Sequence, residues 1–157
     1  MPDSVLTAAE AVFLRALNEL GVRFILVGMS GALLQGARGA TEDIDIWFET
    51  TNDPRIDQAA RRAGGFWVSG AFGMRPPALG GTALGDRFDV VILMHGTRSF
   101  TEEHADAIVV EVDGIPLRVL PLRRILASKK AAGRPKDLAQ IPAIEEAIAA
   151  SEADRKP

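Results

Sequence analysis

The sequence predicts an α/β (α+β) protein in which helices pack on a mixed sheet of five strands. Short apolar runs of strand length alternate with segments of helical periodicity in the first half of the chain, and two helical segments follow the last strands. The 157 residues are 47% hydrophobic and 25% charged, which suits one domain with its own core. We therefore expect a single domain over residues 1–157 with a short C-terminal helical segment, 122–149.

The first elements are predicted to be a helix, a buried strand and a second helix. Apolar positions recur at helical spacing over residues 5–20, where Thr7 and Glu10 are placed as a capping box. Residues 22–27 are almost continuously apolar, which indicates a strand buried on both faces. Residues 29–35 then indicate a short helix that starts directly after this strand.

The middle of the chain contains two further strands and one glycine-rich segment. Residues 44–48 and 88–94 are rich in β-branched and apolar residues, so each is predicted to be a strand. Residues 57–63 indicate a helix. Residues 64–86 are rich in glycine, and we expect a mobile loop there with a short strand at Phe66–Val68.

The C-terminal third is predicted to be a hairpin followed by two helices. Segments 107–112 and 115–120 flank the turn pair Asp113-Gly114, which is typical of a tight hairpin. The other expected elements are a helix from Pro121 through Lys130, a break at Gly133–Pro135, a helix from about Lys136 to Ala149, and a frayed end from Ser151 to Pro157.

Composition excludes several classes of site. The chain has no cysteine, so it forms neither disulfides nor thiolate zinc sites, which fits a reducing compartment. Residues 1–7 lack a basic n-region, and no apolar run reaches the length of a membrane span. A net charge of −3 argues against general nucleic-acid coating but leaves room for a local basic patch. We expect a cytoplasmic protein that does not bind membranes.

Asp43 and Asp45 are the first candidate metal ligands. Side chains alternate along a strand, so these two carboxylates share one face while Ile44 and Ile46 point into the core. Such a pair is commonly only a solvated surface. Near a core, however, two anions repel, and a divalent cation between them relieves the repulsion. Oxygen ligands without histidine or cysteine favour Mg²⁺ or Mn²⁺ over zinc.

Asp89 supplies a third acid from the later strand. A carboxylate among the apolar residues of 88–94 is costly unless it is paired or bound to metal. Asp86 is the alternative candidate, but it precedes the strand and suits a loop cap better. If the two acidic strands are neighbours, three carboxylates converge, and such a set holds two ions about 4 Å apart for in-line phosphoryl or nucleotidyl transfer.

Phosphate contacts are predicted where the first strand meets the second helix. Gly28, Met29 and Ser30 lie at a helix N-terminus, where free backbone N–H groups favour an anion, and the Ser30 hydroxyl can donate to a phosphate oxygen. The same pattern also describes an ordinary capped turn, and it is not a Walker loop.

Cations are concentrated between residues 128 and 137. They suit a solvated helix end, or alternatively Lys129 or Lys136 reaches the triphosphate or the pyrophosphate leaving group. Asp137 is placed to cap the last helix. His95 is expected to be a strand-end residue rather than a substrate contact.

These residues together resemble the nucleotidyltransferase superfamily, which includes DNA polymerase beta, antibiotic nucleotidyltransferases and toxins of type IV toxin–antitoxin systems. Residues 26–30 resemble its strand-end glycine motif, and residues 38–45 are similar to the segment that leads into its paired aspartates. Asp89 matches its third acid, and residues 129–138 resemble the tail of small bacterial members. The resemblance implies the nucleotidyltransferase fold, with a mixed, mostly antiparallel five-stranded sheet.

The resemblance also implies roles for individual residues. Asp43 and Asp45 would hold both metals, and Asp89 would hold one and help to activate the attacking hydroxyl. Gly28 and Ser30 would bind the triphosphate. Met29 departs from the family pattern, which has a small residue there.

The chain leaves no room for a large helical substrate domain after the sheet. An acceptor would then be held by a partner protein, by a second copy in a homodimer, or by the glycine-rich segment, with Arg75 and Arg87 as anion contacts.

Two functions follow as expectations. The first is a Mg²⁺-dependent enzyme that moves a nucleoside monophosphate from an NTP, such as ATP, to a hydroxyl of RNA, protein or a small molecule. Toxin-like action on tRNA or on a protein is its expected form. The alternative is a weak or inactive member that binds a nucleotide or a partner, for instance as half of a toxin–antitoxin pair.

Overall fold

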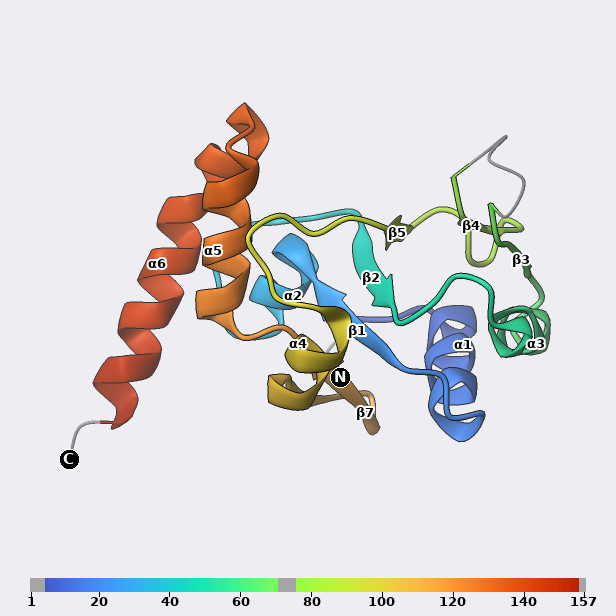
Figure 1. Cartoon of the computed structure of the whole chain (residues 1–157). Helices are drawn as coiled ribbons and strands as arrows, with labels where there is room; N and C mark the ends of the chain where they lie inside the picture. The colour runs from blue at the N-terminus through green and yellow to red at the C-terminus, as the bar shows by residue number, and fades with distance from the viewer. Residues whose placement is uncertain (1–4, 71–75, 156–157) are drawn as a thin grey trace.

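A computed structural model, which describes residues 5–70 and 76–155, places five strands in one mixed sheet (Figure 1). The strand order is β5-β2-β1-β7-β6. The pairs β1/β2 and β6/β7 are antiparallel, whereas β1/β7 and β2/β5 are parallel. The mixed five-stranded sheet is confirmed, but it is evenly divided rather than mostly antiparallel. Its strands are β1 (Phe24–Val27), β2 (Ile44–Phe48), β5 (Phe88–Val91), β6 (Ile108–Val112) and β7 (Ile115–Val119).

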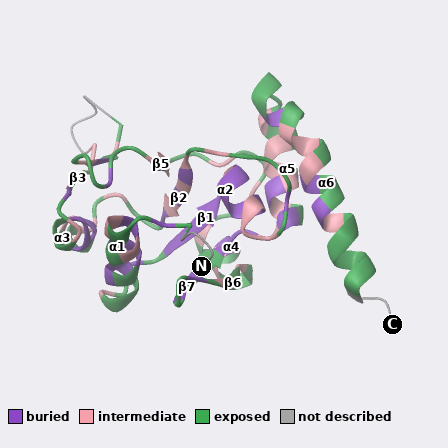
Figure 2. Cartoon of the chain, turned by 180° about the vertical axis from the view of Figure 1, so that it is seen from behind, coloured by how far each residue is buried: buried purple, intermediate pink, exposed green. Residues whose placement is uncertain are grey.

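Helices cover both faces of the sheet, and each face has its own core. The central strand β1 is buried at all four positions, as its continuous apolar run predicts. Ile25 and Val27 belong to one core, whereas Phe24 and Leu26 belong to the other. Figure 2 shows this central region as the most deeply buried part of the chain. Helices α1 (Ala8–Glu19) and α3 (Pro54–Arg62) pack in the core that contains Phe24 and Leu26. Helices α2 (Gly28–Leu33), α5 (Leu122–Ala132) and α6 (Pro135–Arg155) pack in the core that contains Ile25 and Val27.

The predicted capping box begins α1. The Thr7 hydroxyl accepts the Glu10 N–H at 3.1 Å, and Glu10 Oε1 accepts the Thr7 N–H at 2.9 Å. Glu10 is buried and also pairs with Arg87 at 3.2 Å. The Arg87 side chain, expected as an anion contact, is therefore engaged at the start of α1. Arg75 lies outside the described residues.

The C-terminal elements follow the sequence pattern closely. The hairpin turn uses Asp113 and Gly114, both at positive φ, and α5 ends at Gly133 in the left-handed conformation. The fraying expected from Ser151 is wrong as far as Arg155, because α6 continues to that residue. Among the described helices, none combines the length and apolarity needed to cross a lipid bilayer.

Three elements differ from the sequence prediction. In the glycine-rich segment, the expected strand at Phe66–Val68 is confirmed as β3, but it pairs with a second strand, β4 (Ala78–Gly80), that the sequence did not predict. The last strand before the hairpin is shorter than predicted and ends at Val91. A helix, α4 (Phe100–Asp106), follows it and was not predicted, although Ser99 and Glu102 have the spacing of a capping box.

Candidate functional site

Asp43, Asp45 and Asp89 converge at one end of the sheet. Parallel pairing of β2 with β5 places Asp45 directly opposite Asp89. One carboxylate oxygen from each of the three residues lies within 4.8 Å of the others. Ile44 and Ile46 are buried on the opposite face of β2, as the alternation predicts. The sheet therefore gathers the acids and fixes them on packed strands. Asp86, the alternative third acid, lies outside this cluster.

The acidic cluster changes the pKa of Asp45. Its burial, and next the negative charge of Asp89, raise the pKa of Asp45 to about 6, while Lys129 acts in the opposite direction. Asp89 is exposed because β5 is an edge strand, so the burial that the apolar sequence of this strand suggested is not observed. Three carboxylates beside one another, with no nitrogen or sulfur ligand in the cluster, form a donor set that suits Mg²⁺ or Mn²⁺.

Gly28 and Ser30 support Asp45 from the start of α2. Ser30 is buried, its hydroxyl donates to the Val27 carbonyl at 2.9 Å, and the same oxygen accepts the Asp45 N–H at 2.9 Å. The Ser30 hydroxyl therefore holds the backbone of Asp45. The sequence had suggested that this hydroxyl donates to a phosphate oxygen. Gly28 has φ +63, and a Cβ there would lie 2.9 Å from the carboxyl carbon of Asp45. Met29 is buried in the core beneath them.

Replacing Gly28 with alanine tests this close approach. Gly28→Ala is expected to lower the free energy of unfolding by about 1–3 kcal/mol more than Gly64→Ala, because only the first variant crowds Asp45. Both glycines have positive φ, and a Cβ at Gly64 meets no atom within 4 Å. Urea denaturation measures the difference, and equal losses in the two variants would contradict the proposed crowding.

A cavity of about 180 Å³ opens beside the three acids. The predicted residues Gly28, Met29, Lys129 and Lys136 all line it, whereas Ser30 does not. The loop after β5 forms one wall, and α5 with the start of α6 forms the other. Lining residues that the sequence did not single out as site residues include Thr41, Leu93, Met94, Arg134 and Gln140. His95, which was expected to be only a strand-end residue, lines the cavity as well.

The cationic side of the cavity is organised around Asp137. This side chain is buried, and its carboxylate accepts from Lys129 Nζ at 3.3 Å and from Arg134 Nε at 2.7 Å. Burial alone would raise the pKa of Asp137, but the hydrogen bonds from Arg134 and Lys129 outweigh it, so that the pKa is lowered. The carboxylate also accepts the Arg134 N–H at 3.2 Å, which caps α6 as the sequence predicted.

The arrangement combines two charged sides around one cavity. Three carboxylates at the sheet end can hold divalent cations, and Lys129, Arg134 and Lys136 face the same space from α5 and α6. An anionic ligand that carries a divalent cation satisfies both sides at once. Nucleoside triphosphates are ligands of this kind.

Comparisons with known proteins identify the fold. No protein-family profile matches the sequence, and no curated protein matches it by sequence similarity. Solved structures do match. The crystal structure of ANT(2″)-Ia in complex with adenylyl-2″-tobramycin shares 14% identity over 92% of this chain and 90% of that chain, with a TM-score of 0.55.

Two further solved structures have a similar fold. A solution structure of the antibiotic-resistance factor ANT(2″)-Ia matches 93% of this chain and 84% of its own, at 14% identity and a TM-score of 0.56. An antigenic nucleotidyltransferase-like protein from Paracoccidioides brasiliensis matches 88% of this chain and 77% of its own, at 18% identity and a TM-score of 0.51. The chain therefore has the nucleotidyltransferase fold.

Proposed function

We propose that this chain, which has the nucleotidyltransferase fold, is a divalent-metal-dependent enzyme that transfers a nucleoside monophosphate from an NTP to a hydroxyl group. The observation that carries the proposal is the convergence of Asp43, Asp45 and Asp89, whose ligand oxygens lie within 4.8 Å of one another on adjoining strands. Bound Mg²⁺ or Mn²⁺ would neutralise charge on the reacting phosphate and acidify the attacking hydroxyl.

Side chains of the protein would supply the proton acceptor and the phosphate contacts for this reaction. The hydroxyl oxygen forms a bond to the α-phosphorus while the bond to the bridging oxygen breaks and pyrophosphate leaves. Asp89 is the exposed acid at the edge of the sheet, so it is the carboxylate placed to take the hydroxyl proton. Lys129, Lys136 and Arg134 would bind the triphosphate, and Asp137 keeps Lys129 in place. Gly28 leaves room for Asp45 beside the strand end.

Several classes of molecule can serve as the hydroxyl-bearing acceptor. RNA, including tRNA, protein and small molecules all offer hydroxyl groups, and toxin action within a toxin–antitoxin pair would use either of the first two. The complex of ANT(2″)-Ia with adenylyl-2″-tobramycin gives a fold neighbour with a small-molecule adduct, which adds that class to the acceptors worth testing.

One observation favours a second candidate, a nucleotide-binding protein without transferase activity. The Ser30 hydroxyl is already used by Val27 and Asp45, and Met29 is buried, so the start of α2 offers no free side-chain hydroxyl to a phosphate. Such a protein would bind an NTP with Mg²⁺ and leave it intact.

The decisive experiment incubates the protein with Mg²⁺ and α-³²P-labelled NTPs together with cellular RNA, cellular protein, or tobramycin. Label transfer by the wild type that disappears in Asp43→Asn supports the enzyme. Transfer that survives in Asp43→Asn contradicts the assignment. Thermal stabilisation by Mg²⁺ with an NTP, without transfer to any acceptor, supports the binding protein instead; saturation at 100 times the dissociation constant adds about 2.7 kcal/mol.

A further inference from the structure

One wall of the candidate cavity has no regular structure of its own. Leu93, Met94 and His95 line the cavity from the segment between β5 and α4. Within the described part of the chain, this segment has a turn at residues 95–96 but no helix or strand. The position of the wall therefore depends on its side chains and on close packing.

The first contact that fixes this wall is at Gly96, which packs against α5. Its φ is +68, and a Cβ there would lie 2.7 Å from the Ala131 side chain and 2.8 Å from the Ala127 carbonyl oxygen. The wall backbone thus touches the helix whose residues Ser128 and Lys129 also line the cavity.

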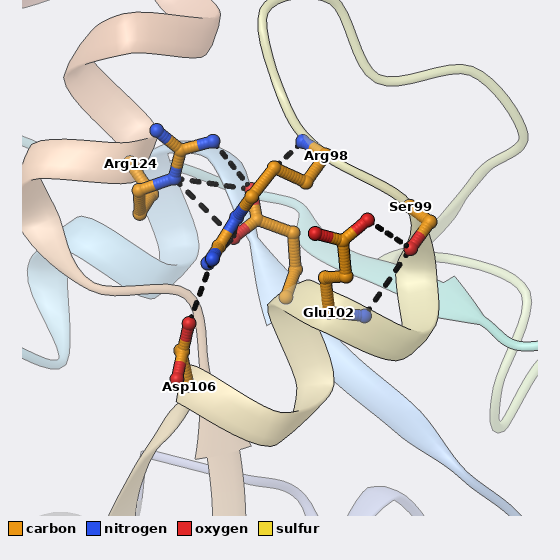
Figure 3. A network of polar contacts seen from close by, with 6 residues as sticks. Arg98, Ser99, Glu102, Asp106 and Arg124 are labelled. Atoms are coloured by element: carbon orange, nitrogen blue, oxygen red, sulfur yellow. Dashed lines mark hydrogen bonds and ion pairs between the residues drawn. The ribbon is translucent and has the colours of Figure 1, made fainter.

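The second contact that fixes this wall is made by the carboxylate of Glu103, which is buried in α4. Arg98, at the end of the wall segment, donates its backbone N–H at 3.2 Å and its Nη2 at 2.6 Å to this carboxylate. Arg124 of α5 donates Nη2 at 2.8 Å and Nε at 3.1 Å. Figure 3 shows Arg98 of the wall segment beside Arg124 of α5, with Asp106 next to the Arg98 guanidinium. Arg98 Nη1 also pairs with Asp106 at 2.8 Å.

Glu103 is fully buried, whereas 39% of the Arg98 side chain and 31% of the Arg124 side chain remain exposed. Burial alone would raise the pKa of Glu103, but hydrogen bonds from Arg124 and Arg98 outweigh it and lower the pKa. The carboxylate is therefore ionised at neutral pH and holds two guanidinium groups that would otherwise repel each other.

We propose that Glu103 is a positioning residue that sets the width of the nucleotide cavity, because its buried carboxylate ties the His95-bearing wall to the helix that carries Lys129. This inference rests on the proposed function. Glu103 does not line the cavity and acts through Arg98 on one side and Arg124 on the other. Its loss is expected to weaken NTP binding while leaving the three acids in place, since these lie on β2, β5 and the residue before β2.

Glu103→Gln tests the inference, with Glu102→Gln as the matched control. Glu102 lies on the same helix, and its exposed carboxylate accepts a hydrogen bond from the Ser99 hydroxyl at 3.0 Å rather than from Arg98 or Arg124. Glu103→Gln is expected to raise the KM for the NTP by about 10-fold or more, with kcat changed much less, as for other residues that orient a binding site indirectly. Hydrogen exchange at the Arg98 amide, which donates to the Glu103 carboxylate at 3.2 Å, should accelerate in the same variant.

A second variant keeps the test informative if Glu103→Gln folds poorly. Gly96→Ala leaves the carboxylate intact, and its Cβ should push the wall from α5. It should therefore also raise the KM for the NTP and accelerate exchange at the Arg98 amide. Unchanged exchange, or an unchanged KM despite faster exchange, overturns the inference. Failure of the proposed function is separate, because it would appear as absent transfer and absent NTP binding in the wild type, while exchange without nucleotide still reports whether Glu103 holds the wall.

Discussion

Asp45→Asn is expected to stabilise the metal-free protein at pH 8 by about 1–3 kcal/mol and to remove its stabilisation by Mg²⁺. Burial and the charge of Asp89 raise the pKa of Asp45 from 3.8 to about 6 in the folded protein. Between these two pH values the folded state binds more protons than the unfolded state, so wild-type stability falls as the pH rises and then levels off. An asparagine carries no charge and avoids this loss.

Urea denaturation in EDTA at pH 4 and pH 8 measures the difference in unfolding free energy between Asp45→Asn and the wild type. The two proteins should differ little at pH 4, because Asp45 is then largely protonated in the folded wild type. Asp86→Asn is the control, since Asp86 is exposed and outside the acidic cluster. A wild type that is more stable than Asp45→Asn at pH 8 in EDTA would show that repulsion at the cluster does not dominate. Titration with Mg²⁺ should then reverse the order of stability.

Asp89→Asn is expected to reduce nucleotide transfer by about 10²–10³-fold, the usual effect of removing one group that stabilises charge in the transition state. The pairing of Asp45 with Asp89 brings the third carboxylate to the other two, and Asp89 is the member of the cluster most open to an incoming acceptor. The loss should fall on kcat, because Lys129 and Lys136, which we propose to bind the triphosphate, lie on α5 and α6 and are unchanged in this variant.

Asp86→Asn provides the matched comparison for this prediction as well. It removes the same charge three residues earlier, before β5 begins. Its transfer rate should remain within about twofold of the wild type, because exposed substitutions outside the site have small effects. Equal losses in Asp86→Asn and Asp89→Asn would mean that the pairing of β5 with β2 does not create the site. Rates are measured with saturating NTP and with the acceptor identified in the transfer assay.

Local patterns predicted much of the fold and the acidic half of the site. Alternation around Asp43 and Asp45 placed the isoleucines in the core and the carboxylates together, and the structure confirms this because β2 is a regular strand. The capping box at Thr7 and the turn at Asp113 were predicted for the same reason: each depends on residues close together in the chain.

Contacts between distant segments could not be predicted in this way. The engagement of the Ser30 hydroxyl with Asp45 depends on how α2 meets β2, and the burial of Asp137 depends on the packing of α5 against α6. The exposure of Asp89 follows from the place of β5 at the edge of the sheet, which its apolar composition conceals. The strand β4 was not predicted, because its three residues are stabilised by pairing with β3 and carry no strong signal of their own.

The parallel pairing of β1 with β7 joins Leu26 to Val119, and α5 and α6 follow directly after β7. On the ribosome, the strands that carry the acids emerge well before the helices that carry Lys129 and Lys136. One face of β1, which pairs with the acid-bearing strand β2, shares its core with Ile125 of α5 and Ile144 of α6, so this face is covered only when both helices have been made. Nucleotide chemistry would thus begin only after translation of the last helix, and truncation before residue 129 should yield an inert product.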